Sequence, residues 1–335
     1  MVPVADGVTE IDTLLGGWEH ATAGFLVSGP APVLVETGSQ SSVPVLLDAL
    51  ARLGIGAGDL AGIAVTHVHL DHAGGVGDVA RAFPGAVVYV HELGARHLAD
   101  PSRLVASAGR VYGTLLDDLY GRLAPTDAER IRVLADGEPI ALGGGRTLTA
   151  IDSPGHAKHH LAYHDSTSGL LFAGDAAGVK LPDGGPLRPA TPPPDFDLDL
   201  ACGSLARFAA RRPAAIALAH YGIVPGEPDE LLAQADAALH AWADEATRAH
   251  REGRDIAEAL AERFAADTAS TDPAVRSKLE TLNGFHSNAA GFRRWLETRA
   301  SRAPGSSGVA AHHEHPTDDE RRERVAAEQE EARPG

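Results

Sequence analysis

The sequence predicts an α/β protein that continues into a helical extension. Over residues 1–225, short apolar runs rich in β-branched residues alternate with stretches that have helical apolar spacing. This alternation is typical of strands and helices packed in layers around one core. From residue 226 to 301 the strand-like runs stop, while the helical spacing continues. At 335 residues the chain is long enough for one large domain with an appendage.

The expected elements of residues 1–225 are short and are separated by glycine and turn residues. Val43 opens a helix that extends to Leu53, for which Ser41 or Ser42 is the expected N-cap. The proline- and glycine-rich stretch 180–194 is expected to form a long loop. The other expected helices are 75–82, 92–98 and 201–212. The expected strands are 22–27, 32–36, 63–66, 86–90, 131–134, 139–142, 147–152, 161–164, 169–173 and 215–218.

The segment 101–123 interrupts this alternation. Its apolar residues recur at helical spacing, and it carries the aromatic residues Tyr112 and Tyr120. We expect a helical insertion that lies near a pocket of the α/β domain.

Residues 226–301 are expected to form a small helical subdomain packed on the α/β domain. Asp272 and Pro273 form an N-cap followed by proline at the first helical position. Such a subdomain could also serve as a lid or as the surface of a homodimer. Residues 302–335 lack aromatic side chains and are predicted to be a disordered tail. The apolar helical face consists of Leu232, Ala235, Leu239, Trp242 and Ala246, and the later anchors are Phe285, Phe292, Trp295 and Leu296.

The composition points to a soluble, cytoplasmic protein. The formal net charge is −17, from 46 acidic and 29 basic residues, and this sign disfavours nucleic acid and anionic membranes as partners. The sequence has no run of about 20 apolar residues and no signal peptide at its start. Cys202 is the only cysteine, so no disulfide can form within one chain. We therefore expect a small-molecule substrate.

A dense group of metal-ligating residue types follows the strand expected at 63–66. Within six residues the chain carries His67, His69, Asp71 and His72. Histidines two positions apart project together when the chain is extended or tightly turned, and the Asp-His pair beyond them can reach back. The end of a strand is also where α/β sheets usually place a ligand site. The group therefore predicts a metal site.

Three more residues of ligand type stand at the ends of expected strands. Each of His156, Asp175 and His220 follows an apolar run. A glycine precedes the first two, which permits a tight turn at the strand end. Any one of the three would be a weak signal alone. Together with the first group, and in this order, they indicate a site for two metal ions.

The order of these motifs resembles the metallo-β-lactamase superfamily, whose H-x-H-x-D-H motif matches the first group. The resemblance covers residues from about 8 to 225. It implies an αββα sandwich of four layers, with two mixed sheets face to face, helices outside, and a dinuclear metal centre at one edge. It also implies two divalent metal ions; imidazole and carboxylate ligands without thiolate suit zinc, and also iron or manganese. Glu36-Thr37-Gly38 resembles the family's Asp-Thr-Gly turn, with Glu in place of Asp.

The resemblance further implies a chemistry. A hydroxide held between two metals is a nucleophile at neutral pH, and the metals polarise a carbonyl or phosphoryl oxygen. Asp71 would accept a hydrogen bond from the bridging water, and Tyr221 could donate to the developing oxyanion. One of the histidines at 159, 160 and 164 could orient a ligand. The implied ligands are His67, His69 and His156 for metal one, and Asp71, His72 and His220 for metal two, with Asp175 bridging.

The resemblance narrows the activity without giving the substrate. The β-lactamases of the family lack the bridging aspartate, so Asp175 argues against antibiotic hydrolysis. Lactonases of the family carry a tyrosine three residues after that aspartate, where this chain has Gly178, although Tyr112 or Tyr120 could enter the pocket. Glyoxalase II enzymes carry basic glutathione-binding residues near their C-terminus, and no such motif matches here. The leading hypothesis is a dinuclear hydrolase that acts on a small ester, lactone or thioester.

Two other classes of function stay open. A mononuclear iron sulfur (persulfide) dioxygenase of the same fold retains these ligand residues but binds metal only at the first site. A metal-binding scaffold without turnover ranks last, because all seven ligand positions are filled. A metal count with identity separates the first two, since hydrolysis favours two metals per chain and the dioxygenase favours one iron.

Overall fold

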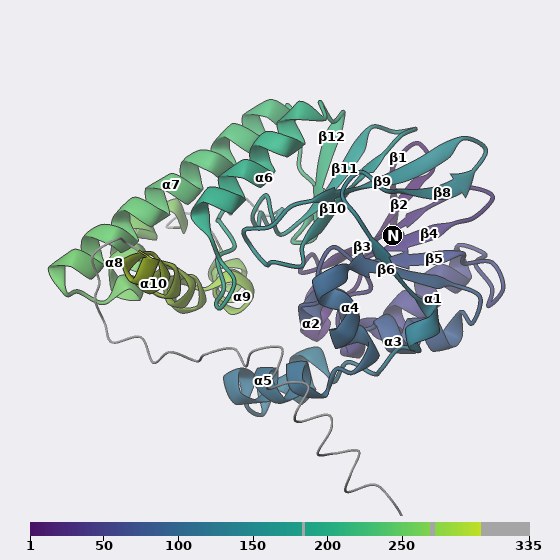
Figure 1. Cartoon of the computed structure of the whole chain (residues 1–335), viewed down its shortest axis with the longest axis horizontal. Helices are drawn as coiled ribbons and strands as arrows, with labels where there is room; N and C mark the ends of the chain where they lie inside the picture. The colour runs from purple at the N-terminus through teal and green to yellow at the C-terminus, as the bar shows by residue number, and fades with distance from the viewer. Residues whose placement is uncertain (183–184, 269–271, 303–335) are drawn as a thin grey trace, which may run out of the picture. The chain divides into compact units, whose positions relative to one another are not determined.

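Two β-sheets with helices on their outer sides make up most of the chain (Figure 1). The computed structural model describes residues 1–182, 185–268 and 272–302, and residues 1–296 form one unit. Of the predicted disordered tail 302–335, Arg302 is described and ends a helix, and residues from 303 onward lie outside the described residues. Among the described helices, none combines the length and apolarity needed to cross a membrane.

The first sheet has seven strands in the order β1-β2-β3-β4-β5-β6-β7. Neighbouring strands are antiparallel from β1 to β4 and parallel from β4 to β7. The parallel strands all end at one edge, and the first ligand group follows β5 at that edge. The strands are β1 (Val2–Ala5), β2 (Val8–Asp12), β3 (Ala23–Val27), β4 (Val33–Val35), β5 (Gly62–Ala64), β6 (Val87–His91) and β7 (Ile131–Leu134).

The second sheet has six strands in the order β13-β12-β11-β10-β9-β8. Only β11 and β12 pair in parallel, so their carboxyl ends also lie at one edge. The other described pairs of this sheet are antiparallel. The strands are β8 (Pro139–Gly143), β9 (Arg146–Asp152), β10 (Leu161–Asp165), β11 (Leu170–Gly174), β12 (Ala215–Leu218) and β13 (Gly222–Ile223).

The two sheets share an apolar core to which both contribute one face. The rings of Phe25 from β3 and Phe172 from β11 lie 5.1 Å apart across it. The hydroxyl of Tyr163 on β10 donates to the carbonyl of Val65, which follows β5, at 2.8 Å. A buried tyrosine needs such a partner, because an unmade hydrogen bond there costs free energy. This core holds the ends of β5 and β11 at a fixed separation, and the ligand residues follow those ends.

Helices cover the outer face of the first sheet and close a second core against it. The helix predicted from Val43 forms, but its predicted cap is different in detail: Ser42 stands at the N-cap position, while its hydroxyl bonds the hydroxyl of Ser39 at 2.9 Å instead of a helix amide. The cause is the 3-10 turn η2 (Gln40–Ser42), which leads directly into the helix. The helices on this side are α1 (Val43–Arg52), α2 (Leu70–Ala73), α3 (Val76–Ala82) and α4 (Glu92–Ala99).

The C-terminal helices pack on the outer face of the second sheet and form a third core with it. Trp242 of α7 stacks between Phe264, at 5.0 Å, and Phe285, at 5.3 Å between ring centroids. The carboxylate of Asp272 accepts from the amide of Ala274, so the predicted cap is present. The boundary placed between residues 225 and 226 stays a prediction. The helices of this core are α6 (Leu198–Ala210), α7 (Pro228–Glu252), α8 (Ile256–Phe264) and α10 (Phe285–Arg302). The buried apolar residues of α9 (Pro273–Asn283) pack instead in a small cluster with Val179 and Leu181.

The segment 101–123 is helical, as the apolar spacing predicts. It forms α5 (Ser102–Tyr112) and a short π-helical turn η3 (Leu116–Tyr120). Strands β1 and β2 were not predicted. Their hairpin turns at Asp6-Gly7, a pair typical of tight hairpins between alternating strands.

Candidate metal centre

The seven predicted ligands meet where the two sheets end. His67 and His69 follow β5, and the short helix α2 carries Asp71 and His72. The second sheet contributes His156 after β9, Asp175 after β11 and His220 after β12. Strands far apart in sequence thus bring their carboxyl-end residues to one place, as expected for ligand sites in α/β proteins. The structure brings all seven residues together.

Two glycines allow the chain to present ligands from the second sheet. Gly155 has a φ of +132°, and a side chain there would collide with the backbone of Ala201 on α6. Gly174 has a φ of +54°, and a side chain there would meet Thr66 and the ring of His160. Because only glycine adopts these conformations without strain, each one turns the strand end so that the next residue points into the centre.

Three imidazoles form one half of the centre, called the imidazole set: His67, His69 and His156. The Nε2 atom of His67 lies 2.9 Å from Nδ1 of His69 and 3.2 Å from Nε2 of His156. Nδ1 of His69 lies 3.1 Å from Nε2 of His156. Three nitrogens that converge on one point suit a metal ion at about 2.0–2.1 Å from each.

The other half, called the carboxylate set, consists of Asp71, His72 and His220. Nε2 of His220 lies 3.3 Å from Oδ2 of Asp71, and Nε2 of His72 lies 3.6 Å from the same oxygen. Asp175 stands between the two sets: its Oδ2 is 3.5 Å from Nε2 of His72 and 3.7 Å from Nε2 of His156. A carboxylate in that position can contact a cation in either set.

Two buried atoms of the centre support a cation as the group it holds. Nε2 of His72 and Oδ1 of Asp175 are buried, and neither has a hydrogen-bond partner among the described residues. A buried polar atom without a partner carries a large desolvation cost. A divalent cation bound by imidazole nitrogens and carboxylate oxygens would remove that cost, and the donor set fits zinc, iron or manganese.

Outward-facing hydrogen bonds fix the orientation of three of the rings. Nδ1 of His220 donates to the carbonyl of Ala21 at 2.7 Å, and Nδ1 of His156 donates to the carbonyl of Ala190 at 3.0 Å. His67 contacts the hydroxyl of Thr66 at 2.9 Å through Nδ1. Hydrogen bonds of this kind leave the other ring nitrogen as the ligand atom. The sequence did not predict these roles of Ala21 and Ala190, because any residue type can supply a backbone carbonyl.

Glu36 supports the centre from the loop after β4. Its carboxylate accepts from the amide of Thr66 at 2.7 Å and lies 3.1 Å from Nδ1 of His72. Glu36 adopts a φ of +65°, in the left-handed region that favours glycine. The sequence pointed to this residue as part of a supporting turn, and the structure places its side chain directly behind a ligand.

Charge divides the two sets. Burial lowers the pKa of His67 and His69 well below the ordinary value, and the neighbouring imidazoles lower it further. Burial also acts on His72 and His220, but the carboxylates around them outweigh it and raise the pKa of both. Asp175 has a pKa well below its usual range: burial opposes ionisation, and His72 and His220 overcome that effect.

Of the three histidines considered as supports, His160 contacts the centre most directly. It is buried, its Nδ1 lies 2.8 Å from the hydroxyl of Ser153, and its Nε2 accepts from the amide of Asp175 at 3.3 Å. His159 accepts from the amide of Val68 at 3.4 Å. His164, on β10, makes no described contact with a ligand residue.

The predicted oxyanion donor, Tyr221, has its contacts elsewhere. Its ring lies 4.8 Å from that of His20, and its hydroxyl shares a hydrogen bond with Glu10. No contact with a ligand side chain is described for it, so its catalytic role stays a prediction. Tyr112 and Tyr120 differ: their rings lie 4.7 Å apart, and the charge of Asp71 acts on both hydroxyls.

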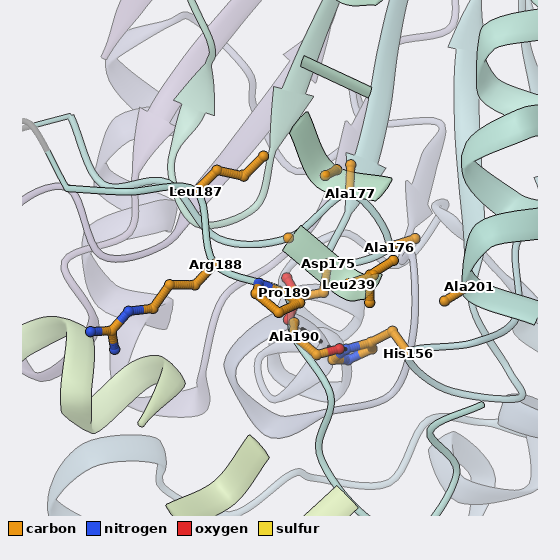
Figure 2. A pocket seen from close by; sticks show the side chains of 12 residues that line it. His156, Asp175, Ala176, Ala177, Leu187, Arg188, Pro189, Ala190, Ala201 and Leu239 are labelled. Atoms are coloured by element: carbon orange, nitrogen blue, oxygen red, sulfur yellow. Dashed lines mark hydrogen bonds and ion pairs between the residues drawn. The ribbon is translucent and has the colours of Figure 1, made fainter. Parts of the chain in front are cut away.

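A small pocket reaches the centre from the side of the second sheet (Figure 2). His156 and Asp175 lie next to each other in it, and Ala201 and Leu239 belong to the α6 and α7 walls. Arg188 extends away from the ligands (Figure 2) and lies 2.6 Å from the carboxylate of Glu280 on α9. The C-terminal helices therefore contribute to the surroundings of the centre.

The family follows from a direct comparison. A model described as the metallo-beta-lactamase superfamily matches residues 16–220, which is more than half of the chain. This chain belongs to the metallo-β-lactamase superfamily. Its αββα sandwich is therefore the fold expected from the motifs, and His/Asp groups able to bind metal stand at its edge.

The most similar proteins include one of known structure. Metallo-beta-lactamase fold-containing protein ST1585 of Sulfurisphaera tokodaii is 31% identical over 165 residues, which cover 48% of this chain and 60% of that one. The solved structure of the protein has a TM-score of 0.62 at 22% identity, over 87% of this chain and 99% of that chain. At this identity the likeness of the structures concerns the fold alone.

The relatives that are named as enzymes include a hydrolase and a thioesterase. A hydroxyacylglutathione hydrolase of Gloeobacter violaceus is 32% identical, over 39% of this chain and 38% of its own. An acyl-coenzyme A thioesterase of Bos taurus, MBLAC2, is 32% identical, over 33% of this chain and 39% of its own. The chain thus spans between about two fifths and three fifths of these curated relatives.

Proposed function

We propose that this protein is a metal-dependent hydrolase with a dinuclear centre that cleaves a small ester, lactone or thioester. The observation that carries the proposal is the position of Asp175, whose Oδ2 lies 3.5 Å from His72 on one side and 3.7 Å from His156 on the other. One carboxylate shared by two sets of ligands can bind a metal ion in each set, which supports a pair of metal ions.

The chain's own residues would hold the metal ions, orient the ligand rings and position a water molecule. Divalent ions of the kind that this donor set fits, zinc first among them, would supply Lewis acidity and a hydroxide at neutral pH. Asp71 is partly exposed and lies 3.3 Å from Nε2 of His220, so its carboxylate can hold a water proton at the mouth of the centre. The carbonyls of Ala21 and Ala190 hold two rings in place, which keeps the ligand nitrogens aimed inward.

The thioester is the substrate class that we rank first. One relative is named a thioesterase and another a hydroxyacylglutathione hydrolase, and both names support hydrolysis at an acyl group. The net charge of −17 supports a small molecule over a nucleic acid. Cytoplasmic location and a homodimer through the C-terminal helices stay predictions from the sequence.

A single observation favours a second candidate, the mononuclear iron sulfur dioxygenase. The imidazole set is complete without Asp71, since its three ligand nitrogens lie within 3.2 Å of one another. One iron could be held there alone. Oxygen uptake with a persulfide, and one iron per chain, would support this candidate.

The experiment that tests the proposal is a metal count combined with a hydrolysis panel. We expect about two metals per chain after purification and reconstitution, and turnover of at least one of an ester, a lactone and a thioester. Asp175→Ala should lower the metal content and reduce hydrolysis by about a hundredfold or more. Asp48→Ala, an exposed carboxylate paired with Arg52 on α1, is the matched control. One metal and no activity across the panel would contradict the proposal.

A further inference from the structure

A second group of metal-ligating side chains lies between α6 and α7. Cys202 of α6 faces Asp236 and His240 of α7, and the three ligand atoms lie within 4.8 Å of one another. Sγ of Cys202 is 3.6 Å from Nε2 of His240, which is 3.8 Å from Oδ2 of Asp236. We call these three residues the helix-pair cluster. None of them belongs to the candidate metal centre described above, which we call the strand-end centre.

The spacing of the helix-pair cluster matches that of ligands around one zinc-like ion. Zinc–sulfur and zinc–nitrogen bonds of about 2.3 and 2.0–2.1 Å in a tetrahedron place the two atoms about 3.6 Å apart. Cys202 and His240 have that separation. The corresponding nitrogen–oxygen separation is about 3.4 Å. Asp236 therefore needs only a small movement, which its half-exposed side chain can make.

The positions of the ligands in the helices support the same interpretation. Asp236 and His240 are four residues apart on α7, so they project from one face of the helix. Cys202 comes from the neighbouring helix and is partly buried against the core that the two helices share. The cluster therefore has two ligands from one helix and a third from the other, and an ion there would join the two.

A cysteine beside a histidine and an aspartate could instead be a nucleophile. Nucleophilic cysteines have a lowered pKa, because a neighbouring positive charge stabilises the thiolate. Burial and the carboxylate of Asp236 raise the pKa of Cys202 to about 12. The surroundings are thus the opposite of those of an activated thiol, whereas a divalent cation would be attracted by the same carboxylate.

We propose that the helix-pair cluster is a second, separate binding site for a zinc-like divalent cation. Cys202, Asp236 and His240 supply sulfur, oxygen and nitrogen, a water completes the tetrahedron, and the thiol proton is released to solvent on binding. The adjacent residues Ala201, Ala235 and Leu239 line the pocket at the strand-end centre. A cation in the cluster would thus fix the two helices that form a wall of that pocket. This proposal does not depend on the hydrolase activity.

The single cysteine makes the site visible by spectroscopy. Co²⁺ bound to a thiolate gives a strong charge-transfer band in the near ultraviolet, and only Cys202 can supply a thiolate in this chain. The strand-end centre has nitrogen and oxygen ligands only. We therefore expect Co²⁺, added to the metal-free full chain, to produce this band in proportion to the occupancy of the helix-pair cluster.

The decisive variant is His240→Ala. It keeps the thiol but removes a ligand, so the band should need about tenfold more Co²⁺, or more, to reach the same height. His240 is more than half exposed, so this change should not prevent folding. Its matched control is His250→Ala, an exposed histidine on the same helix, which should leave the titration unchanged.

Two results would overturn the proposal. One is a wild-type titration with Co²⁺ that never produces the thiolate band. The other is a band of equal height and midpoint in His240→Ala, which would mean that Co²⁺ merely attaches to the cysteine. Cys202→Ser must lose the band and keep the visible absorption of any Co²⁺ in the strand-end centre, which shows that the variant is folded.

Discussion

The imidazole set and the carboxylate set differ in charge although both draw residues from the same two sheets. His67, His69 and His156 offer three neutral nitrogens, and burial keeps the pKa of each low. The carboxylate set pairs its two imidazoles with Asp71: burial lowers the pKa of both rings, but the carboxylates of Asp71 and Asp175 outweigh it and raise the pKa of both. The imidazole set would therefore bind a metal ion through nitrogen lone pairs, and the carboxylate set would add the attraction of a negative charge.

The difference indicates what each half would prefer to bind. Three imidazoles suit borderline ions such as zinc and iron, whereas a set with a carboxylate also suits harder ions such as manganese. Asp175 touches both sets, so a metal in one half changes the charge felt in the other. The two halves should therefore fill separately but not independently.

The largest effects are expected when each set loses one of its own ligands. His69→Ala should empty the imidazole set and Asp71→Ala the carboxylate set, so each variant should hold about one metal per chain instead of about two. Hydrolysis should fall about a hundredfold or more in both. Metal analysis and turnover of the best substrate from the panel measure the two effects.

Matched controls and a double variant test whether the imidazole set and the carboxylate set bind metal separately. His286→Ala and Asp48→Ala remove an exposed histidine and an exposed aspartate, and both should keep the full metal content. The double variant of His69 and Asp71 should hold none. If either single change empties both halves, the two sets act as one unit and the distinction between them is wrong.

The sequence predicted most of what lies at the strand ends. Four ligand-type residues were found as a dense group after one apolar run and three more at the ends of other apolar runs, and the structure brings these seven residues together. The carbonyls of Ala21 and Ala190 could not be predicted, because a backbone group is placed only by tertiary structure. The helix-pair cluster left a weaker signal: Asp236 and His240 have helical spacing, but their partner Cys202 lies on another helix.

The fold was predicted less completely at its N-terminal edge. Strands β1 and β2 contain Pro3 and acidic residues that weaken the apolar alternation, yet the Asp6-Gly7 pair between them was a usable hairpin signal. Nothing in the sequence predicted how the strands of the two sheets are aligned with one another. Contacts such as that of Phe25 with Phe172 depend on strands more than a hundred residues apart.

A smaller effect is expected from the support behind the carboxylate set. Glu36→Gln keeps the size of the side chain but removes its charge and one acceptor. The amide of Thr66 and Nδ1 of His72 then compete for a single oxygen. Loss of such a support typically costs ten- to a hundredfold in metal affinity, and we expect about tenfold here. Competition with a chelator measures it.

The imidazole set provides the internal comparison for Glu36. Glu36 has no described contact with His69 or His156, so the metal in that half should be released at the wild-type chelator concentration. Glu138→Gln, a partly exposed glutamate paired with Arg132, serves as the control. Equal weakening of both metals would show that Glu36 supports the whole centre.

The smallest effect concerns the insertion, whose Tyr112 and Tyr120 are both influenced by the charge of Asp71. Tyr112 is 39% exposed at the end of α5, and the charge of Asp71 raises the pKa of its hydroxyl after the larger effect of burial. A hydroxyl there can donate to a substrate that enters beside Asp71. Tyr112→Phe should therefore raise KM by about threefold with little change in kcat, as expected for one hydrogen bond of about 0.7 kcal/mol. Tyr89→Phe, on β6, is the matched control. If KM and kcat are both unchanged, Tyr112 does not contact the substrate. If kcat alone falls, Tyr112 instead stabilises the transition state.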